Sequence, residues 1–432
     1  MEKKHDKLFV FLLVVLGFIA NFFTAFSLKC LRGDGHFWLS NILADHQFHH
    51  DHPTTRLIIY LYQVIPVFVL NFFSEVVPIE VSYSYGLNYF LISQSILLYF
   101  VCKYLKDRDR FYLFAILSYF ITYIGVDSYA CGVSNLSVSL AWIVLEKIKF
   151  RKTSYDLFLI AGLSTLLIFT YDMSFLFLPL FLWGLYKSEK FSEKEKKYLG
   201  LILFSVLLYM IFALFYTTTS YRKHVSGGFQ SLKNLPFFLF FQFIFFALIC
   251  KVKERIKKKY VCWIGSLILC IGSYLILEFI YNGSIVVLAT ANSYHFRVYS
   301  IPVTVFFMYL YNSEKLKISK ISKVCIVLIA TILVLVSGFS SMKYNDGMNQ
   351  FRKLLTSQEK PCMIFDQANL DLIYGNNQWN DLYKSLNFSG TNKILKIRAY
   401  RTNLKSESCL LQSYSREIYR NSKLDLSLFK KQ

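Results

Sequence analysis

Long apolar runs alternate with short polar segments along most of this chain of 432 residues. An α-helix needs about 20 mostly apolar residues to cross a bilayer, and about eleven runs approach that length. The runs are too continuous for barrel strands, and a helix satisfies its own backbone polar groups in lipid. The pattern therefore predicts an all-α integral membrane protein with about eleven transmembrane helices. The runs occupy about 8–28, 85–102, 111–126, 135–146, 157–171, 173–186, 198–216, 235–250, 261–281, 297–311 and 324–340.

A further apolar run, residues 57–73, does not fit as a span. As a span it would place the basic segment 103–110 outside the cell, against the rule that cytoplasmic loops carry the excess of Lys and Arg. If the run is instead an amphipathic helix in the outer membrane interface, eleven spans remain. In that topology 26 of the 48 Lys and Arg residues lie in inner segments and 7 lie in outer loops before residue 341. The sequence therefore predicts a cytoplasmic N-terminus and an extracytoplasmic C-terminus.

Composition agrees with a membrane protein, because 55% of the residues are hydrophobic, 18% are aromatic and the mean hydropathy is +0.41. The formal net charge of +21 would suggest a nucleic-acid partner in a soluble protein. Here most of the basic residues lie in segments assigned to the inner face, so the charge is an orientation signal. Membrane lipids are the expected contacts of these residues, and no nucleic acid is expected.

Two domains are expected. Residues 1–340 form the transmembrane domain, with a first outer loop at 29–84, and residues 341–432 form a polar tail long enough for a small extracytoplasmic domain. The first apolar run has no small-residue cleavage site after it, so it is expected to remain as an uncleaved span.

The tail contains two segments with the composition of strands, PCMIF at 361–365 and ILKIRAY at 394–400. It also contains Cys362 and Cys409, which would both lie in an oxidising compartment. The two cysteines either pair there or remain as free thiols, and the sequence leaves both alternatives open.

The segment 29–56, in the first outer loop, concentrates the polar chemistry of the chain. It carries five of the eight histidines and three aspartates, while the predicted spans hold few charges. Transporters usually keep charged groups near the middle of the bilayer. The sequence therefore favours an active site at the outer membrane face. The polar residues are Asp34, His36, Asp45, His46, His49, His50, Asp51 and His52.

Three stretches resemble the C-type superfamily of membrane glycosyltransferases. The first outer loop has Arg32-Gly33-Asp34-Gly35 after the first span, then His52-Pro53-Thr54 and the helix-forming LIIYLYQVIP. The segment 160–186 is similar to the family's paired spans with a short outer turn and a Pro-containing return helix. HFRVYSIPVTVFFMYLY (295–311) is similar to the opening of one of the family's late spans. The resemblance covers about residues 8–340.

This resemblance implies an enzyme that moves a sugar from a polyprenyl-phosphate donor to a cell-surface glycan, a lipid or a protein. Transfer would occur at the outer face of a bacterial inner membrane. Two other functions stay open: an O-antigen or polysaccharide polymerase, and a flippase or transporter of lipid-linked oligosaccharides. A polymerase would tend to carry its largest, Arg-rich loop later in the chain, and a transporter would need a charged central cavity.

Asp34 is the candidate catalytic residue. Sugar transfer needs a base that takes the proton of the acceptor hydroxyl, and Gly33 and Gly35 would let a substrate approach closely. The alternative is that Asp34 caps a helix over residues 36–47.

Other residues of the same loop are candidates for binding. Asp51 and His52 are expected to contact substrate. On a helix, His46, His49 and His50 would share a face with Asp45 beside them, which is a candidate site for a divalent metal. The alternative for these residues is a hydrated loop in contact with lipid headgroups.

Further donor-binding candidates lie in later loops. Arg297, with His295, is expected to hold the phosphate leaving group, and the alternative is an arginine that anchors the chain at the interface. Arg222 and Lys223 are candidates for the carrier phosphate or belong to a plain hydrated loop. In the turn at Tyr171 and Asp172, Asp172 is either a ligand for sugar hydroxyls or an ordinary turn residue.

Overall fold

The computed structural model describes residues 2–31, 59–73, 78–120, 133–168 and 172–216 as continuous segments. Shorter described parts are 35, 38–39, 42–43, 46–49, 122, 170, 304, 308, helical stretches within 326–349, and strands at 363–365 and 399–401. The predicted spans 235–250 and 261–281 lie outside the described residues, and only residues 304 and 308 of the predicted span 297–311 are described.

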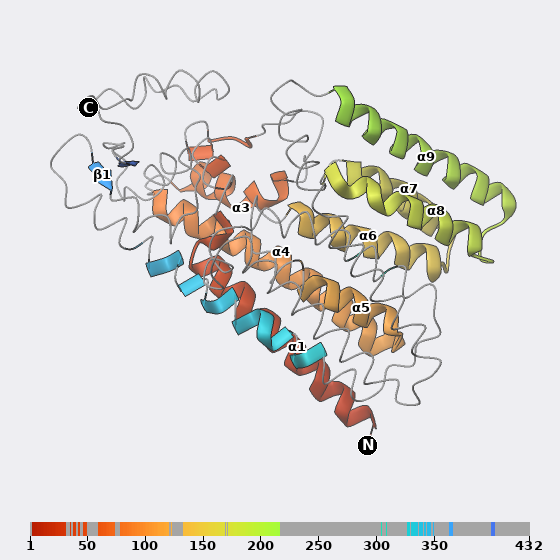
Figure 1. Cartoon of the computed structure of the whole chain (residues 1–432), viewed down its shortest axis with the longest axis horizontal. Helices are drawn as coiled ribbons and strands as arrows, with labels where there is room; N and C mark the ends of the chain where they lie inside the picture. The colour runs from red at the N-terminus through yellow and green to blue at the C-terminus, as the bar shows by residue number, and fades with distance from the viewer. Residues whose placement is uncertain are drawn as a thin grey trace.

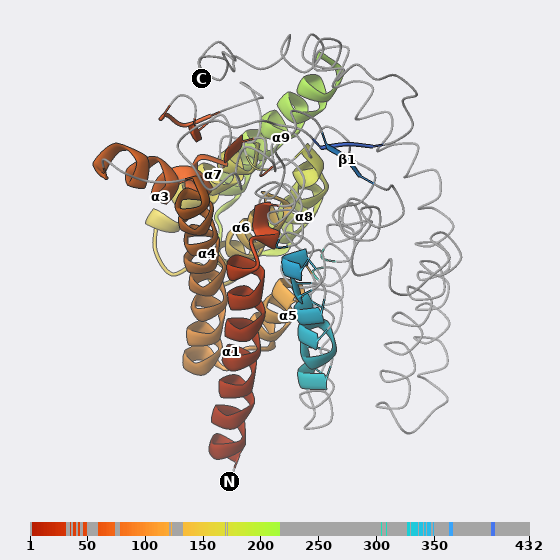
Figure 2. The same ribbon diagram turned by 90° about the vertical axis from the view of Figure 1, so that its left-hand side faces the viewer.

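The helices α1 (Glu2–Phe26) and α4 (Pro78–Asp107) pack side by side and antiparallel (Figures 1 and 2). Phe9 near the start of α1 meets Tyr104 near the end of α4, with ring centroids 6.4 Å apart. At the other end of the pair, Gly86 lies against the backbone of Ala25. Membrane helices approach closely where small residues face one another, which is what this glycine permits.

A tight turn joins α4 to α5 (Arg110–Tyr119). Arg108 ends α4 in the left-handed conformation, with φ of 51°, and its N–H still donates to the Tyr104 carbonyl at 2.8 Å. Asp109 then caps α5, because its Oδ1 accepts a hydrogen bond of 2.8 Å from the Phe111 N–H. Every residue of α5 from Phe111 onward is buried, so α5 is the central helix of the described bundle.

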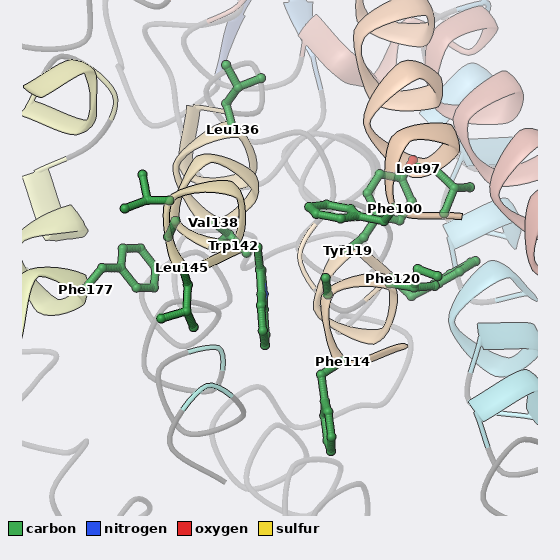
Figure 3. Packing of buried hydrophobic residues seen from close by; sticks show 14 of the residues in the cluster. Leu97, Phe100, Phe114, Tyr119, Phe120, Leu136, Val138, Trp142, Leu145 and Phe177 are labelled. Atoms are coloured by element: carbon green, nitrogen blue, oxygen red, sulfur yellow. The ribbon is translucent and has the colours of Figure 1, made fainter. Parts of the chain in front are cut away.

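Aromatic side chains fill the core around α5 (Figure 3). The Phe111 ring meets the Trp142 ring of α6 (Val133–Lys149) edge to face, with centroids 5.0 Å apart. Such pairs add about 0.5–1.5 kcal/mol beyond the burial of apolar area. The core therefore joins α4, α5 and α6 through large, interlocking rings.

The next helices form a series of hairpins. The segment 160–186 contains a turn followed by a Pro-containing return helix, as expected. The two helices of this pair are shorter than membrane spans, so their role as paired spans stays a prediction. Pro179 stands in the first turn of the return helix, where no backbone N–H is required. The elements are α6 (Val133–Lys149), α7 (Tyr155–Ile168), η3 (Asp172–Phe177), α8 (Leu178–Lys187) and α9 (Glu193–Tyr216).

The helix α3 (Ile59–Phe72) has 14 residues and is about 20 Å long, too short to cross a hydrocarbon core of about 30 Å. Figure 2 shows it steeply inclined to α1 and α4. One side exposes a stripe of apolar residues and the other buries Tyr62 and Gln63. A helix within 57–73 is therefore confirmed, and its place at the membrane interface stays a prediction. The exposed stripe is Leu61, Val64, Phe68 and Phe72.

Three helices in the described part are long and apolar enough to cross a membrane: Lys7–Phe26, Ile79–Asp107 and Ile326–Asp346. The described part of the chain is therefore that of a helical membrane protein. The last of these helices continues beyond residue 340, the boundary expected for the tail domain.

A small parallel sheet is described in the tail, formed by β1 (Met363–Phe365) and β2 (Ala399–Arg401). The first strand lies inside the predicted segment 361–365. The second overlaps the predicted segment 394–400 only at its end and continues to Arg401. Both described strands therefore overlap segments that the sequence predicted.

Candidate functional site

Polar residues gather at the end of the bundle where α1 finishes and α3 lies, which we call the loop end. The opposite end, where α4, α6 and α8 finish and α5, α7 and α9 begin, carries most of the described Lys and Arg side chains and is called the basic end. The predicted chemistry of the first outer loop belongs to the loop end.

The chain leaves α1 through a buried turn. Leu28 has a φ of 58°, a left-handed conformation that closes helices, and its N–H donates to the Ala25 carbonyl at 3.1 Å. The helix η1 (Lys29–Leu31) follows, packed on α1 and α4, and all three of its residues are buried. The chain just before Asp34 is therefore anchored in the core.

Lys29 is the most unusual residue of this turn, because none of its surface is exposed. Its Nζ donates to the Ser337 carbonyl at 3.5 Å, which joins η1 to the helix Ile326–Asp346. Burial of an ammonium group is costly unless hydrogen bonds or charges compensate it. The sequence alone indicated only that Lys29 lies in the first outer loop, at 29–84. Its position just after a helix C-terminus, where cations are favoured, was the available signal.

Cys30 has no role as a nucleophile in this arrangement. Burial raises the pKa of its thiol, and hydrogen bonds from backbone groups of Cys30 and Leu31 only partly oppose that shift. The thiol therefore stays protonated at neutral pH, and the thiolate is the reactive form of cysteine.

The helix α3 holds the segment 46–49 in place. Gln63 accepts a hydrogen bond of 2.8 Å from the His49 N–H and donates one of 2.8 Å to the His49 carbonyl. Asn71 donates to the His46 carbonyl at 2.9 Å. Asn88 of α4 donates in turn to the Leu61 carbonyl of α3 at 2.7 Å. This segment of the loop is thus fixed to α3, and α3 is fixed to α4.

The helical face assumed for the metal prediction is wrong for residues 46–49. His46 has a φ of 55° and ends a helical turn, because its N–H donates to the Ile42 carbonyl at 2.8 Å. The chain from His46 to His49 is not helical. Among the described residues, no group of three or more His, Cys, Asp or Glu side chains is arranged to hold a metal. Asp45 and His50 lie outside the described residues, so a divalent metal stays a prediction.

A cluster of buried hydroxyl groups lies at the same end of α6 and α7. Ser137 and Ser174 share a hydrogen bond of 2.8 Å, and Thr170 lies 3.1 Å from Ser174. These contacts fix the turn that leads into η3. Asp172 begins η3, which agrees with its prediction as a residue of a tight turn, while Tyr171 lies outside the described residues.

The other predicted site residues lie outside the described residues, and the structure neither brings them together nor separates them. They are Asp34, Asp51, His52, Arg222, Lys223, His295 and Arg297.

Sequence reasoning missed the polar contacts inside the bundle. Asn21 of α1 donates to Gln94 of α4 at 3.0 Å and to the Tyr119 hydroxyl of α5 at 2.6 Å. A single Asn in an apolar run was the signal, because polar residues in spans usually face the bundle interior.

A second missed contact joins α4 to α6 near the basic end. The buried carboxylate of Glu146 accepts hydrogen bonds from the Tyr99 hydroxyl at 2.6 Å and from Lys103 Nζ at 2.8 Å. Glu146 is 3% exposed, so its carboxylate is shielded from water, while the Lys103 side chain is 32% exposed. They explain how a carboxylate can lie between two helices.

Two anchors at the loop end, η1 and α3, hold the chain on either side of the residues that lead from Asp34 to Asp45. Anchoring of this kind suits chemistry that needs a carboxylate in a set position beside a membrane. Comparisons of the chain with models of protein families, with curated proteins and with solved structures found no match.

Proposed function

We propose that this protein is a membrane glycosyltransferase with about eleven spans, which moves a sugar from a polyprenyl-phosphate donor to an acceptor at the outer membrane face. The observation that carries the proposal is the buried helix η1, which ends at Leu31, three residues before Asp34. A catalytic carboxylate must be held within a fraction of an ångström of its substrate, and residues on rigid elements meet that demand better than free loops.

Asp34 acts as the general base in this proposal. Its carboxylate takes the proton from the acceptor hydroxyl while the acceptor oxygen forms a bond to the anomeric carbon of the sugar. The bond between that carbon and the phosphate oxygen breaks, and its electron pair leaves with the polyprenyl phosphate. Atoms and charge balance without a further reactant.

The leaving phosphate gains negative charge as this bond breaks, so it needs fixed positive charge nearby. Arg297 supplies a planar fork of donors for that purpose, with His295 beside it. Arg222 and Lys223 hold the carrier phosphate, and Asp51, His52, Tyr171 and Asp172 contact the sugar or the acceptor. The acceptor is a cell-surface glycan, a lipid or a protein.

The test uses the purified full-length protein and a panel of polyprenyl-phosphate sugars. Release of polyprenyl phosphate that requires an added acceptor is the expected result. Reaction only with a lipid-diphosphate polysaccharide would indicate a polymerase. Movement of a lipid-linked oligosaccharide across vesicles without bond cleavage would indicate a transporter, and either result would reject the proposal.

A further inference from the structure

A polar contact joins the beginning of the first outer loop to the helix that leads into the tail. Lys29 Nζ, in η1, donates to the Ser337 carbonyl of the helix Ile326–Asp346 at 3.5 Å. The two residues are 308 positions apart in the chain. Figures 1 and 2 show this helix, drawn in cyan, beside α1. The contact therefore links the chain just after its first predicted span to the last predicted span.

Lys29 is held in place on the side of α1 and α4. None of the surface of Lys29, Cys30 or Leu31 is exposed, and η1 packs on both helices. An amino group in such a place costs free energy unless hydrogen-bond acceptors compensate it. An apolar side chain would fill the same space without that cost. The polar contact of Lys29 therefore indicates a use beyond packing, as ionisable residues between membrane helices usually do.

The helix Ile326–Asp346 turns a face with several small and polar residues to the bundle. Its buried residues recur every three or four positions, as residues on one face of an α-helix do. Small residues let membrane helices approach closely, so the side chain of Lys29 can reach a backbone carbonyl there. In the part of the chain that the structure describes, the buried Ser337 and Ser341 hydroxyls have no hydrogen-bond partner. The buried residues of this face are Ala330, Val334, Ser337, Ser341 and Tyr344.

The position of η1 limits the position of Asp34. Asp34 follows Leu31 by three residues, and three residues span at most about 11 Å even when fully extended. A displacement of η1 is therefore passed on to the proposed catalytic carboxylate. Misplacing a reacting group by about 1 Å can lower a rate by about 10²-fold. A contact that holds η1 in place is thus able to control the rate of the proposed reaction.

We propose that Lys29 is a positioning residue for the sugar transfer. Its amino group holds η1 against the helix Ile326–Asp346 and so fixes the place where Asp34 meets the acceptor hydroxyl. This inference rests on the proposed function. Lys29 contacts neither the donor nor the acceptor in this role, so its removal displaces the base without removing a substrate contact. The rate of the chemical step then falls while substrate binding changes little.

The first test is Lys29→Met, because methionine has a similar unbranched side chain and no hydrogen-bond donor. Release of polyprenyl phosphate is measured with the full-length protein and expressed per folded molecule. The value of kcat should fall about 10²-fold, while KM for the donor and the pH profile of kcat stay near wild type. An unchanged kcat would overturn the inference. A loss that appears in KM, or a shifted pH profile, would instead assign Lys29 to substrate binding or to proton transfer and would also overturn it.

The matched control is Lys7→Met, which makes the same change at an exposed lysine near the beginning of α1. It should leave kcat at the wild-type value. A loss as large as that of Lys29→Met would show a general effect of charge and reject the inference. The folded fraction and the unfolding temperature are measured for both variants. If kcat per folded molecule is normal in Lys29→Met, Lys29 serves stability alone and the inference is wrong.

A second measurement does not depend on sugar transfer. Spin labels are attached at Phe26→Cys and Met342→Cys, both exposed positions, in a background without the native cysteines. Electron paramagnetic resonance gives the distribution of distances between the labels, which should be narrow with Lys29 and broader in Lys29→Met. An unchanged distribution would show that the contact does not hold the two elements together, and would overturn the inference. A broader distribution in a protein whose wild type transfers no sugar would reject the proposed function and leave the structural role of the contact standing.

Discussion

Arg151 joins two turns at the basic end through one side chain. Its guanidinium donates two hydrogen bonds of 2.7 Å to the Glu195 carboxylate. Ser192, at the start of α9, donates its backbone N–H to the same carboxylate at 2.9 Å. Arg151 and Ser192 together hold the pKa of Glu195 at about 2, below its ordinary value of 4.5.

This low pKa predicts how stability depends on pH. Because the folded pKa is below the unfolded one, the stabilisation is complete above about pH 4.5 and is lost as pH falls towards about 2. Glu195→Gln should therefore lower the unfolding temperature at pH 7, and the difference from wild type should shrink below about pH 4.5. Glu193→Gln is the control, since Glu193 is 89% exposed in its pair with Lys196 and such pairs contribute little. A difference that stays constant down to the lowest accessible pH would contradict the prediction.

Asp34 gives the sharpest test of the proposed function at the residue scale. If it is the general base, Asp34→Asn should lower the rate of sugar transfer by about 10²–10⁴-fold while donor binding and the unfolding temperature stay near wild type. If it caps a helix, Asn is almost as good a cap as Asp, and activity should persist. Asp45→Asn and Asp51→Asn, measured alongside, show whether the catalytic carboxylate lies at another position of the loop. Full activity in Asp34→Asn together with loss in Asp51→Asn would move the catalytic role to Asp51.

At the scale of the elements, the packing of α1 on α4 depends on Gly86. A Cβ added there would lie 2.5 Å from the Ala25 carbonyl oxygen, and a backbone atom inside a packed pair of helices has little room to move. Gly86→Ala should therefore destabilise the protein by about 1–3 kcal/mol, as other overpacked substitutions do. Thermal unfolding in detergent measures the effect.

Two glycines provide controls for this prediction. A Cβ at Gly17 would collide with the end of the Leu97 side chain, which can move more easily than backbone. Gly17→Ala should thus cost less than Gly86→Ala. Gly200 in α9 has no atom within 4 Å of such a Cβ, and Gly200→Ala should be neutral or stabilising by up to about 1 kcal/mol. If Gly86→Ala matched Gly200→Ala, the close approach of α1 and α4 would be wrong.

The helices that the sequence predicted well are those bounded by local signals. The hairpin within 160–186 followed from two apolar runs with a polar turn and a proline after it. The ends at Leu28, His46 and Arg108 were not predictable, because all three adopt the left-handed conformation that usually falls to Gly or Asn. Tertiary packing decides these ends, and a local pattern does not contain it.

In the candidate site, too, the sequence predicted what local composition determines and missed what tertiary packing determines. Composition identified the first outer loop as the polar segment next to the first span. The hydrogen bonds from Gln63 to His49 and the burial of Lys29 depend on how α3 and η1 pack, so no spacing along the chain could reveal them. The assumed helix over residues 46–49 failed for a related reason. The histidine spacing fits a helix, but the chain there is not helical, and side chains of α3 hold it by hydrogen bonds.

At the scale of the whole molecule, the described helices reverse direction in the order that the predicted topology requires. The turns at 108–109, 150–154 and 188–192 all lie at the basic end, and they coincide with the segments 103–110, 146–155 and 187–197 assigned to the cytoplasm. The excess of Lys and Arg at the basic end predicts that this end is cytoplasmic. With it inside, the first outer loop and the tail are expected outside.

Cysteine labelling in intact cells tests this orientation. In a background without the native cysteines, Ser188→Cys in the turn before α9 should be protected from a membrane-impermeant reagent until the membrane is opened. Ser406→Cys in the tail should be labelled at once.

If α3 were a span, the position of Ser188 relative to α4 would not change, but the sides of both Ser188 and Ser406 relative to the N-terminus would be reversed. An N-terminal tag located on the inner side therefore completes the measurement: with that tag inside, a protected tail or a freely labelled Ser188→Cys would reject the interfacial placement of α3. Labelling of both cysteines on one side of the membrane would reject the odd number of spans predicted between residues 188 and 406.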